Sequence, residues 1–345
     1  MRAKGMTYDT GFVRHGEISR QHFDPEVVLR ELTIIRDDLH CNAVQIIGGD
    51  PDRLELAAKF AARLGLEIWF SPYPLDLTIA EILRMFAECA ERAERLRHEG
   101  AEVVFVTGVE ISLMNRGFLP GETIEKRLSG LILTEPDLRN QRFAELSARV
   151  NKFLGDALAV VRERFTGKVS YAAVPLEQVD WTPFDVVSLE LIRSAEVAGQ
   201  FRAGVRSIVA DGKPVAITGF GTAAYRGAGD RGGRVMEIVE NDEETGAPVR
   251  LDGEYVRDEA GQATYLNELL EIFETEGVDS TFVFLFALEN YPHRPDGDLR
   301  DDLDLASPSI VKVLEGRNGT TYPDMTWEPK AAFAAVAECY RESTP

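Results

Sequence analysis

The stretch Pro214-Val215-Ala216-Ile217-Thr218-Gly219-Phe220-Gly221 has the form around which the chain is organised, a short apolar strand followed at once by a glycine loop. Ala43-Val-Gln-Ile-Ile-Gly-Gly49 repeats that form near the N-terminus. Strands that are apolar throughout, without alternation, are typical of parallel sheets buried on both faces. The sequence therefore predicts an α/β protein whose strands are covered by helices.

Amphipathic helical stretches separate these strands, as expected for successive βαβ units. Eight units favour a closed (β/α)8 TIM barrel, with an open doubly wound sheet as the alternative. One barrel domain of residues 1–345 fits the length, with loop insertions near 116–140 and 226–258 that follow strand ends. The expected strands are residues 6–9, 43–47, 67–70, 103–107, 168–173, 186–190, 215–218 and 281–287.

Composition narrows the range of partners. The chain has 38 Lys and Arg against 58 Asp and Glu, a net charge of −20, so nucleic acid and anionic membrane are not expected to bind. No apolar run approaches the roughly 20 residues that span a bilayer, and no apolar signal core follows the first six residues. Cys41, Cys89 and Cys339 are odd in number and far apart, which favours a reducing cytoplasm. We expect a soluble cytoplasmic protein with a small-molecule substrate; the oligomeric state is open.

Several segments partly match motifs that bind metals or cofactors, but the residues around them do not fit such sites. Gly219-x-Gly221-x-x-Ala224 matches a dinucleotide fingerprint, but no helical period follows it, although Arg226 and these amides could hold a phosphate. The acidic run 296–304 lacks EF-hand spacing, so a solvated or arginine-paired loop is expected there. The five histidines lack zinc spacing, and His15 alone is expected near the barrel rim. The sequence predicts neither a metal nor a cofactor.

Carboxylates are concentrated at the predicted strand ends, which meet at one rim of a barrel. Glu110, Glu190 and Glu289 follow strands four, six and eight, and Asp9 ends the first strand. Cleavage of a glycosidic bond needs an acid and usually a second carboxylate, about 5–5.5 Å away for retention and roughly 6.5–9.5 Å for inversion. The alternative is that these are solvated rim residues or partners of nearby arginines.

Aromatic and polar side chains near the same strand ends suit a sugar. Aromatic faces pack on the C–H faces of sugar rings, and Asp, Asn and Arg bond to hydroxyl groups; each aromatic could equally plug the core. The predicted substrate-binding residues are Asp9, Arg14, Trp69, Tyr73, Asn115, Arg116, Tyr171, Arg193, Tyr225 and Arg226, and Tyr8, Trp181 and Tyr291 are further aromatics of this kind.

Three segments carry a resemblance to a known group of proteins. Val106-Thr-Gly-Val-Glu110, Ile217-Thr-Gly219-Phe-Gly221 and the closing segment from Tyr322 to Phe333 resemble the retaining glycoside hydrolase superfamily of (β/α)8 barrels. More closely, most of the chain looks like actinobacterial proteins labelled abortive infection proteins. The resemblance implies that Glu110 is the acid/base. It also implies that Gly219 stands where a Thr-Glu-Phe-Gly motif has its nucleophile.

Glycine cannot form a glycosyl ester, and four explanations stay open. The substitution is engineered, or Glu190 or Glu289 supplies the base, or the protein is a sugar-binding pseudoenzyme, or it is a biosynthetic enzyme that runs acid/base chemistry on a non-sugar. We expect first a hydrolase or transglycosylase of a small glycoside, with Glu110 as general acid and Asp9, Glu190 and Glu289 as substrate or base residues. The alternatives are an inactive carbohydrate-binding barrel and the biosynthetic enzyme.

Overall fold

The computed structural model describes residues 1–14, 16–124, 126–127, 136–242 and 245–342. His15, which the sequence placed near the rim, lies outside the described residues, as do residues 128–135 of the first predicted insertion.

Eight parallel strands form a closed barrel in the order β1-β12-β9-β8-β7-β6-β5-β4, which confirms the predicted TIM barrel. Closure comes from β1, which pairs with both β4 and β12 and so excludes the open sheet. All eight predicted strands are present. They are β1 (Ala3–Asp9), β4 (Ala43–Gly48), β5 (Glu67–Pro72), β6 (Val103–Val109), β7 (Lys168–Ala173), β8 (Val187–Glu190), β9 (Val215–Phe220) and β12 (Ser280–Val283).

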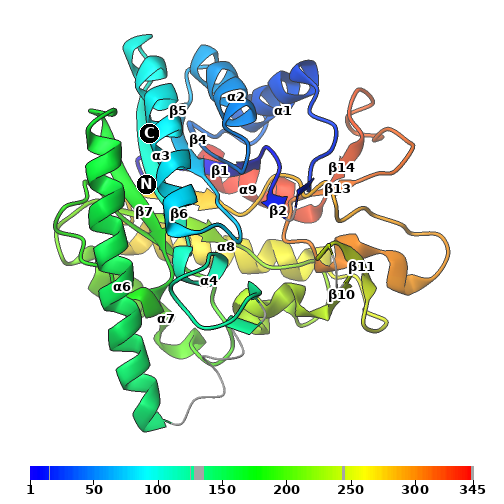
Figure 1. Cartoon of the computed structure of the whole chain (residues 1–345). Helices are drawn as coiled ribbons and strands as arrows, with labels where there is room; N and C mark the ends of the chain where they lie inside the picture. The colour runs from blue at the N-terminus through cyan, green and yellow to red at the C-terminus, as the bar shows by residue number, and fades with distance from the viewer. Residues whose placement is uncertain (15, 125, 128–135, 243–244, 343–345) are drawn as a thin grey trace.

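Helices cover the outside of the barrel (Figure 1). Asp24 and Asp50 cap two helices that each begin at a proline, and their carboxylates accept hydrogen bonds from Glu26 N and Asp52 N. The helices are α1 (Pro25–Asp37), α2 (Pro51–Arg63), α3 (Ile79–His98), α4 (Ile111–Met114), α6 (Pro136–Arg162), α7 (Ala198–Val209), α8 (Glu259–Glu276) and α9 (Ala331–Glu342).

Two connections differ from the expected pattern. The strand predicted over 281–287 ends at Val283, although Phe284 N still donates to Phe220 O of β9 and Phe286 N to Thr7 O of β1. Leu285 and Leu288 pack with the loops above the barrel, whereas Phe286 stays in the main core. Among the described residues between β7 and β8, the only helical element is the 3-10 turn η1 (Pro175–Glu177). This turn has a role in the site.

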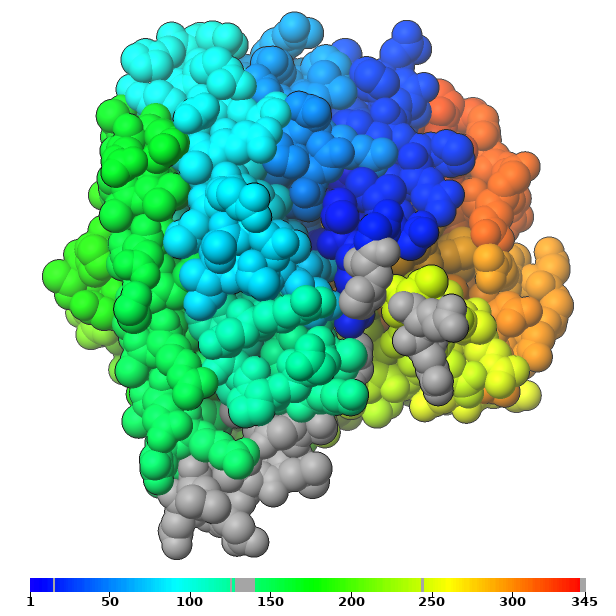
Figure 2. All heavy atoms as spheres, viewed as in Figure 1, coloured from blue at the N-terminus to red at the C-terminus, as the bar shows by residue number. Residues whose placement is uncertain are grey.

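The second predicted insertion lies over the carboxyl end of the barrel. It contains η2 (Ala228–Asp230), η3 (Gly232–Ile238) and the hairpin β10 (Val239–Asn241) and β11 (Pro248–Leu251). Gly246 lies against the side chain of Arg14 from the N-terminal hairpin β2 (Val13–Arg14) and β3 (Glu17–Ile18). Figure 2 shows these dark blue and yellow segments side by side on one face.

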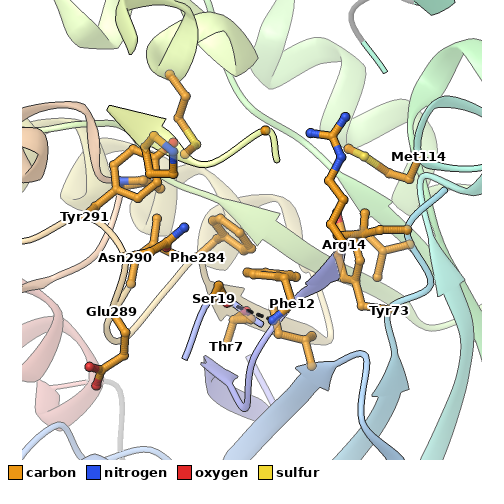
Figure 3. Close-up of a pocket in the computed structure, with 18 of the residues that line it drawn as sticks. Thr7, Phe12, Arg14, Ser19, Tyr73, Met114, Phe284, Glu289, Asn290 and Tyr291 are labelled. Atoms are coloured by element: carbon orange, nitrogen blue, oxygen red, sulfur yellow. Dashed lines mark hydrogen bonds between the residues drawn. The ribbon is translucent and has the colours of Figure 1, made fainter. Parts of the chain in front are cut away.

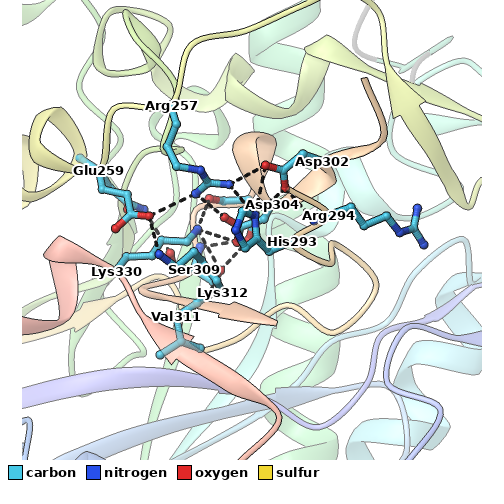
Figure 4. A network of polar contacts seen from close by, with 12 residues as sticks. Arg257, Glu259, His293, Arg294, Asp302, Asp304, Ser309, Val311, Lys312 and Lys330 are labelled. Atoms are coloured by element: carbon cyan, nitrogen blue, oxygen red, sulfur yellow. Dashed lines mark hydrogen bonds and ion pairs between the residues drawn. The ribbon is translucent and has the colours of Figure 1, made fainter. Parts of the chain in front are cut away.

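Buried ion pairs hold the C-terminal loops together, as the sequence predicted for the acidic run. Arg257 pairs with Asp302 at 2.9 Å and with Asp304 at 2.8 Å, and Lys330 Nζ lies 2.9 Å from Asp304 Oδ1 (Figure 4). The side chains of Lys330 and Asp304 are both 0% exposed. These loops carry the strands β13 (Val311–Val313) and β14 (Trp327–Pro329) and the turns η4 (Leu299–Asp301) and η5 (Leu303–Ala306).

We predict that Lys330→Met lowers the free energy of unfolding by about 1–3 kcal/mol, because the buried Asp304 carboxylate loses its ammonium partner and keeps only Arg257. Urea denaturation measures this. The control is Lys152→Met, which removes an exposed pair with Asp156 and should change stability by less than about 1 kcal/mol. Equal small effects of the two substitutions would contradict a structural role for the Lys330 pair.

Candidate active site

A cavity of about 880 Å³ opens at the carboxyl end of the barrel. Three of the predicted carboxylates line it, namely Glu110, Glu190 and Glu289. Figure 3 shows Phe12 and Phe284 in the middle of this cavity, with Glu289 pointing away from them. Three glutamates that were predicted at strand ends therefore line the same cavity.

Glu110 is held in an unusual backbone conformation directly after β6. Its φ and ψ are 45° and 41°, a left-handed region that non-glycine residues seldom adopt, and the register of β6 shifts between Val106 and Val109. Such irregularities at a strand end redirect a side chain and often lie at functional sites. Here they turn Glu110 from the strand into the cavity.

Glu177 fixes the turn that follows Glu110. This buried carboxylate accepts a hydrogen bond from Ser112 N at 3.1 Å, and Tyr171 donates to it at 2.8 Å. The Tyr171 oxygen in turn accepts from Ile111 N at 2.8 Å. Tyr171, predicted to bind substrate, instead holds the first turn of α4 in place.

Glu190 and Gly219 are direct neighbours across β8 and β9. They are paired in the sheet register, which shifts between Leu189 and Glu190. A Cβ atom built on Gly219 would overlap Glu190 Oε2. The Glu190 carboxyl group therefore occupies the volume into which any side chain at position 219 would project.

Burial dominates the electrostatics of the two glutamates. Burial, together with the negative charges of Glu190 and Glu177, raises the pKa of Glu110 to about 8. Burial also raises the pKa of Glu190 to about 7. Oε1 of Glu190 is buried and accepts no hydrogen bond from the described residues. A cavity with two such carboxyl groups can hold one proton and one negative charge near neutral pH.

A second acidic group lies at the other side of the cavity. Arg20 is buried, pairs with Glu31 at 2.8 Å, donates to the Asp9 carbonyl oxygen at 3.0 Å, and lies 3.8 Å from Glu289. Asp9 itself is 2% exposed and does not line the cavity; burial raises its pKa to about 7. Burial raises the pKa of Glu289 as well. Asp9 thus lies behind the cavity wall.

The remaining predicted substrate-binding residues divide into two sets. Arg14 and Tyr73 line the cavity, whereas the others lie away from it. Trp69 packs on Phe282 inside the barrel, Asn115 bonds to Pro74 O, Tyr225 bonds to Val235 O, Arg193 pairs with Glu268, and Arg116 and Arg226 are exposed. Of the further aromatic residues, Tyr8 is buried and donates a hydrogen bond to Glu31, Trp181 packs on Phe184, and Tyr291 lines the cavity.

Several lining residues were not predicted from sequence. Phe12, Leu75, Met114 and Phe284 are partly buried side chains that contribute apolar wall, and Met236 comes from the insertion. Apolar residues near strand ends look like core residues in a sequence. The position of Phe12 just after the first predicted strand was the one available signal, since Phe284 lay inside the strand predicted over 281–287.

One group of described residues has the ligand types of a metal site, His293, Asp302 and Asp304. Arg257 and Lys330 already contact the two carboxylates. Protein cations supply the charge that a metal would bring, so the residues present do not fit an ion.

Among the described residues, no helix combines the length and apolar character needed to cross a membrane.

Comparisons with known proteins support the fold. No protein-family model and no curated protein matches the chain. Solved structures do: a GH113 β-1,4-mannanase is 14% identical, with a TM-score of 0.58 over 98% of each chain. The GH113 β-mannanase AaManA from Alicyclobacillus acidocaldarius is 13% identical, with a TM-score of 0.57 over 99% of this chain and 97% of that one. A family 1 β-glucosidase from Thermotoga maritima is also 13% identical, with a TM-score of 0.56 over the same shares.

The chain is thus a TIM barrel with the fold of glycoside hydrolases, and two partly buried glutamates line the cavity at the carboxyl end of its strands. At these identities the likeness concerns the fold.

The raised pKa values of Glu110 and Glu190 predict a pH dependence of stability. The folded protein holds protons that the unfolded chain releases above its ordinary pKa of 4.5, so stability falls as pH rises from about 4.5 to about 8. The double variant Glu110→Gln/Glu190→Gln should lose much of this decline and melt at a higher temperature than the native protein at pH 8. Melting temperatures across the pH range measure this. The control is Glu122→Gln/Glu254→Gln, which removes two exposed carboxylates. If this control raised the melting temperature at pH 8 by the same amount, the loss of stability with pH would not come from Glu110 and Glu190.

Proposed function

We propose that the protein is a glycosidase-like enzyme that acts on a small glycoside, with Glu110 as general acid and Glu190 as the second carboxylate. The observation that carries this is the position of Glu190, whose carboxyl group fills the space above Gly219. The neighbouring strand thereby offers a carboxylate beside the place where the superfamily motif has its nucleophile.

The two carboxyl groups suit opposite roles. The pKa of both groups is raised, so the pair retains a proton near neutral pH. We assign this proton to Glu110, the acid/base of the resembled motif, which donates it to the leaving oxygen as the glycosidic bond breaks. Glu190 is then the carboxylate. It either attacks the anomeric carbon or takes a proton from the attacking water, and the separation of the two groups decides between retention and inversion. After direct attack, Glu110 takes a proton from water, and that water hydrolyses the glycosyl ester on Glu190. When Glu190 acts as base instead, it releases the proton of the attacking water to solvent, and Glu110 is reprotonated from solvent.

Gly219 has a physical explanation that does not need engineering. Any side chain at position 219 would collide with Glu190, so the glycine and the glutamate at 190 form one arrangement. This supports the explanation in which another carboxylate takes over. The closer resemblance to abortive infection proteins stays a sequence-based prediction, and the compared structures that we describe carry no such label.

The two alternatives differ from this proposal in what they require. A carbohydrate-binding barrel needs hydrogen bonds and aromatic faces but has no use for a pair of glutamates with raised pKa values. A biosynthetic enzyme acting on a non-sugar would use the same pair for proton transfer. The pair therefore favours an enzyme, and the choice between substrates is experimental.

We predict that Gly219→Ala lowers kcat/KM for aryl glycosides by at least about tenfold, because the new methyl group displaces the Glu190 carboxylate, and small displacements at a reacting centre have large effects. Gly219→Glu should be at least as harmful. The control is Gly155→Ala, at a helical position with open space around it. Activity that rises in Gly219→Glu would contradict the assignment of Glu190.

We predict that Glu110→Gln lowers kcat/KM by about 10²–10⁴-fold for glycosides with poor leaving groups such as phenol, because the amide cannot protonate the leaving oxygen. Dinitrophenyl glycosides, which need no such proton, should lose far less. Initial rates over a series of aryl glycosides measure this difference. A uniform loss across the series would remove Glu110 from the acid role.

A further inference from the structure

The cavity lies between two separate apolar clusters. One fills the inside of the barrel and ends in the partly buried side chains of Phe12, Leu75, Met114 and Phe284. The other is built from the insertion and the C-terminal loops, and Phe12, Phe284 and Met236 are packed partly against it. All five of these side chains line the cavity. Each cluster therefore leaves apolar surface facing the open space.

Such a surface is unfavourable in contact with water and becomes favourable when an apolar ligand group covers it. The volume of about 880 Å³ lies in the range of small-molecule sites, roughly 300–1,000 Å³. Figure 3 shows Met114 and Tyr73 on one side of Phe12, and Tyr291 on the far side of Phe284. Apolar wall thus extends across the cavity on both sides of these two rings.

The kind of wall also matters. Among the described residues that line the cavity, none is a tryptophan, and two are methionines from opposite clusters. Methionine side chains are flexible and adapt to irregular apolar shapes. Phe12 is held edge-on against Tyr73, with ring centroids 5.1 Å apart, so a rigid ring lines the cavity together with the flexible side chains.

We infer that the substrate carries an apolar substituent, an alkyl or aryl aglycone, which sits between Met114 and Met236 and against Phe12 and Phe284. This rests on the proposed function, since it assigns the group that would leave when the bond at Glu110 and Glu190 is cleaved. The sugar occupies the part of the cavity near the two glutamates and Thr218, and Thr7 and Gln45 are further polar residues of the cavity lining.

The inference is tested by calorimetric binding of methyl, butyl and hexyl β-glucosides and β-mannosides to the Glu110→Gln variant, which binds without turnover. Affinity should rise from methyl to hexyl, approaching about fourfold for each fully buried methylene group. The variant Met114→Gln/Met236→Gln in the same background should flatten this rise and leave the methyl glycosides unchanged. The control is Val249→Gln, on β11 and half exposed outside the cavity lining, which should keep the full rise.

Equal affinity for methyl and hexyl glycosides would overturn the inference and indicate that the aromatic rings only stack on the sugar. Failure of both hexyl glycosides to bind would overturn it too. The two proposals separate cleanly. If affinity rises with the length of the alkyl group but the native protein hydrolyses no glycoside, the apolar site stands and the hydrolase function is rejected. If the native protein hydrolyses glycosides but affinity does not rise with alkyl length, the hydrolase function stands and the apolar site is rejected.

Discussion

One steric relation determines the chemistry open to this barrel: Glu190 on β8 and Gly219 on β9 are paired across the sheet, and there is room for only one side chain between them. A carboxylate is present at this place because the facing residue is a glycine. The barrel closure fixes the pairing, since parallel strands in a closed sheet cannot slide relative to their neighbours without disturbing the whole ring. The backbone position of Glu190 is therefore fixed by the barrel, while its carboxyl group lies in the space that Gly219 leaves.

The position of Glu110 is also fixed by the surrounding backbone. Its left-handed backbone follows a register shift in β6, and the buried Glu177 with Tyr171 fixes the turn that comes next. A third carboxylate so close to the pair raises the pKa of Glu110 through its negative charge. The short turn η1, which takes the place of a helix between β7 and β8, is what brings Glu177 under α4. The strained backbone, the missing helix and the raised pKa are thus parts of one arrangement.

The sequence predicted the barrel well because its strands are uniformly apolar and recur with clear helical stretches between them. It also predicted which glutamates reach the rim, since a residue that ends a parallel strand can lie nowhere else. It could not predict that Asp9 turns behind the wall or that Tyr171 supports a backbone turn, because a strand-end position does not specify the direction of a side chain. Nor could it show that Gly219 faces Glu190, which depends on strand register. The apolar wall was missed because Met114 and Met236 resemble core residues until the cavity is seen.

The most direct test of the account is chemical rescue by azide or formate. Small external anions replace a carboxylate only where one is missing and space is left for them. With an aryl glycoside that has a good leaving group, the account predicts that Glu190→Ala is nearly inactive and is activated by azide, while the native protein does not respond. Activation of the native protein by azide, with no response from Glu190→Ala, would mean that the missing carboxylate is the one at position 219, and would contradict the role assigned to Glu190.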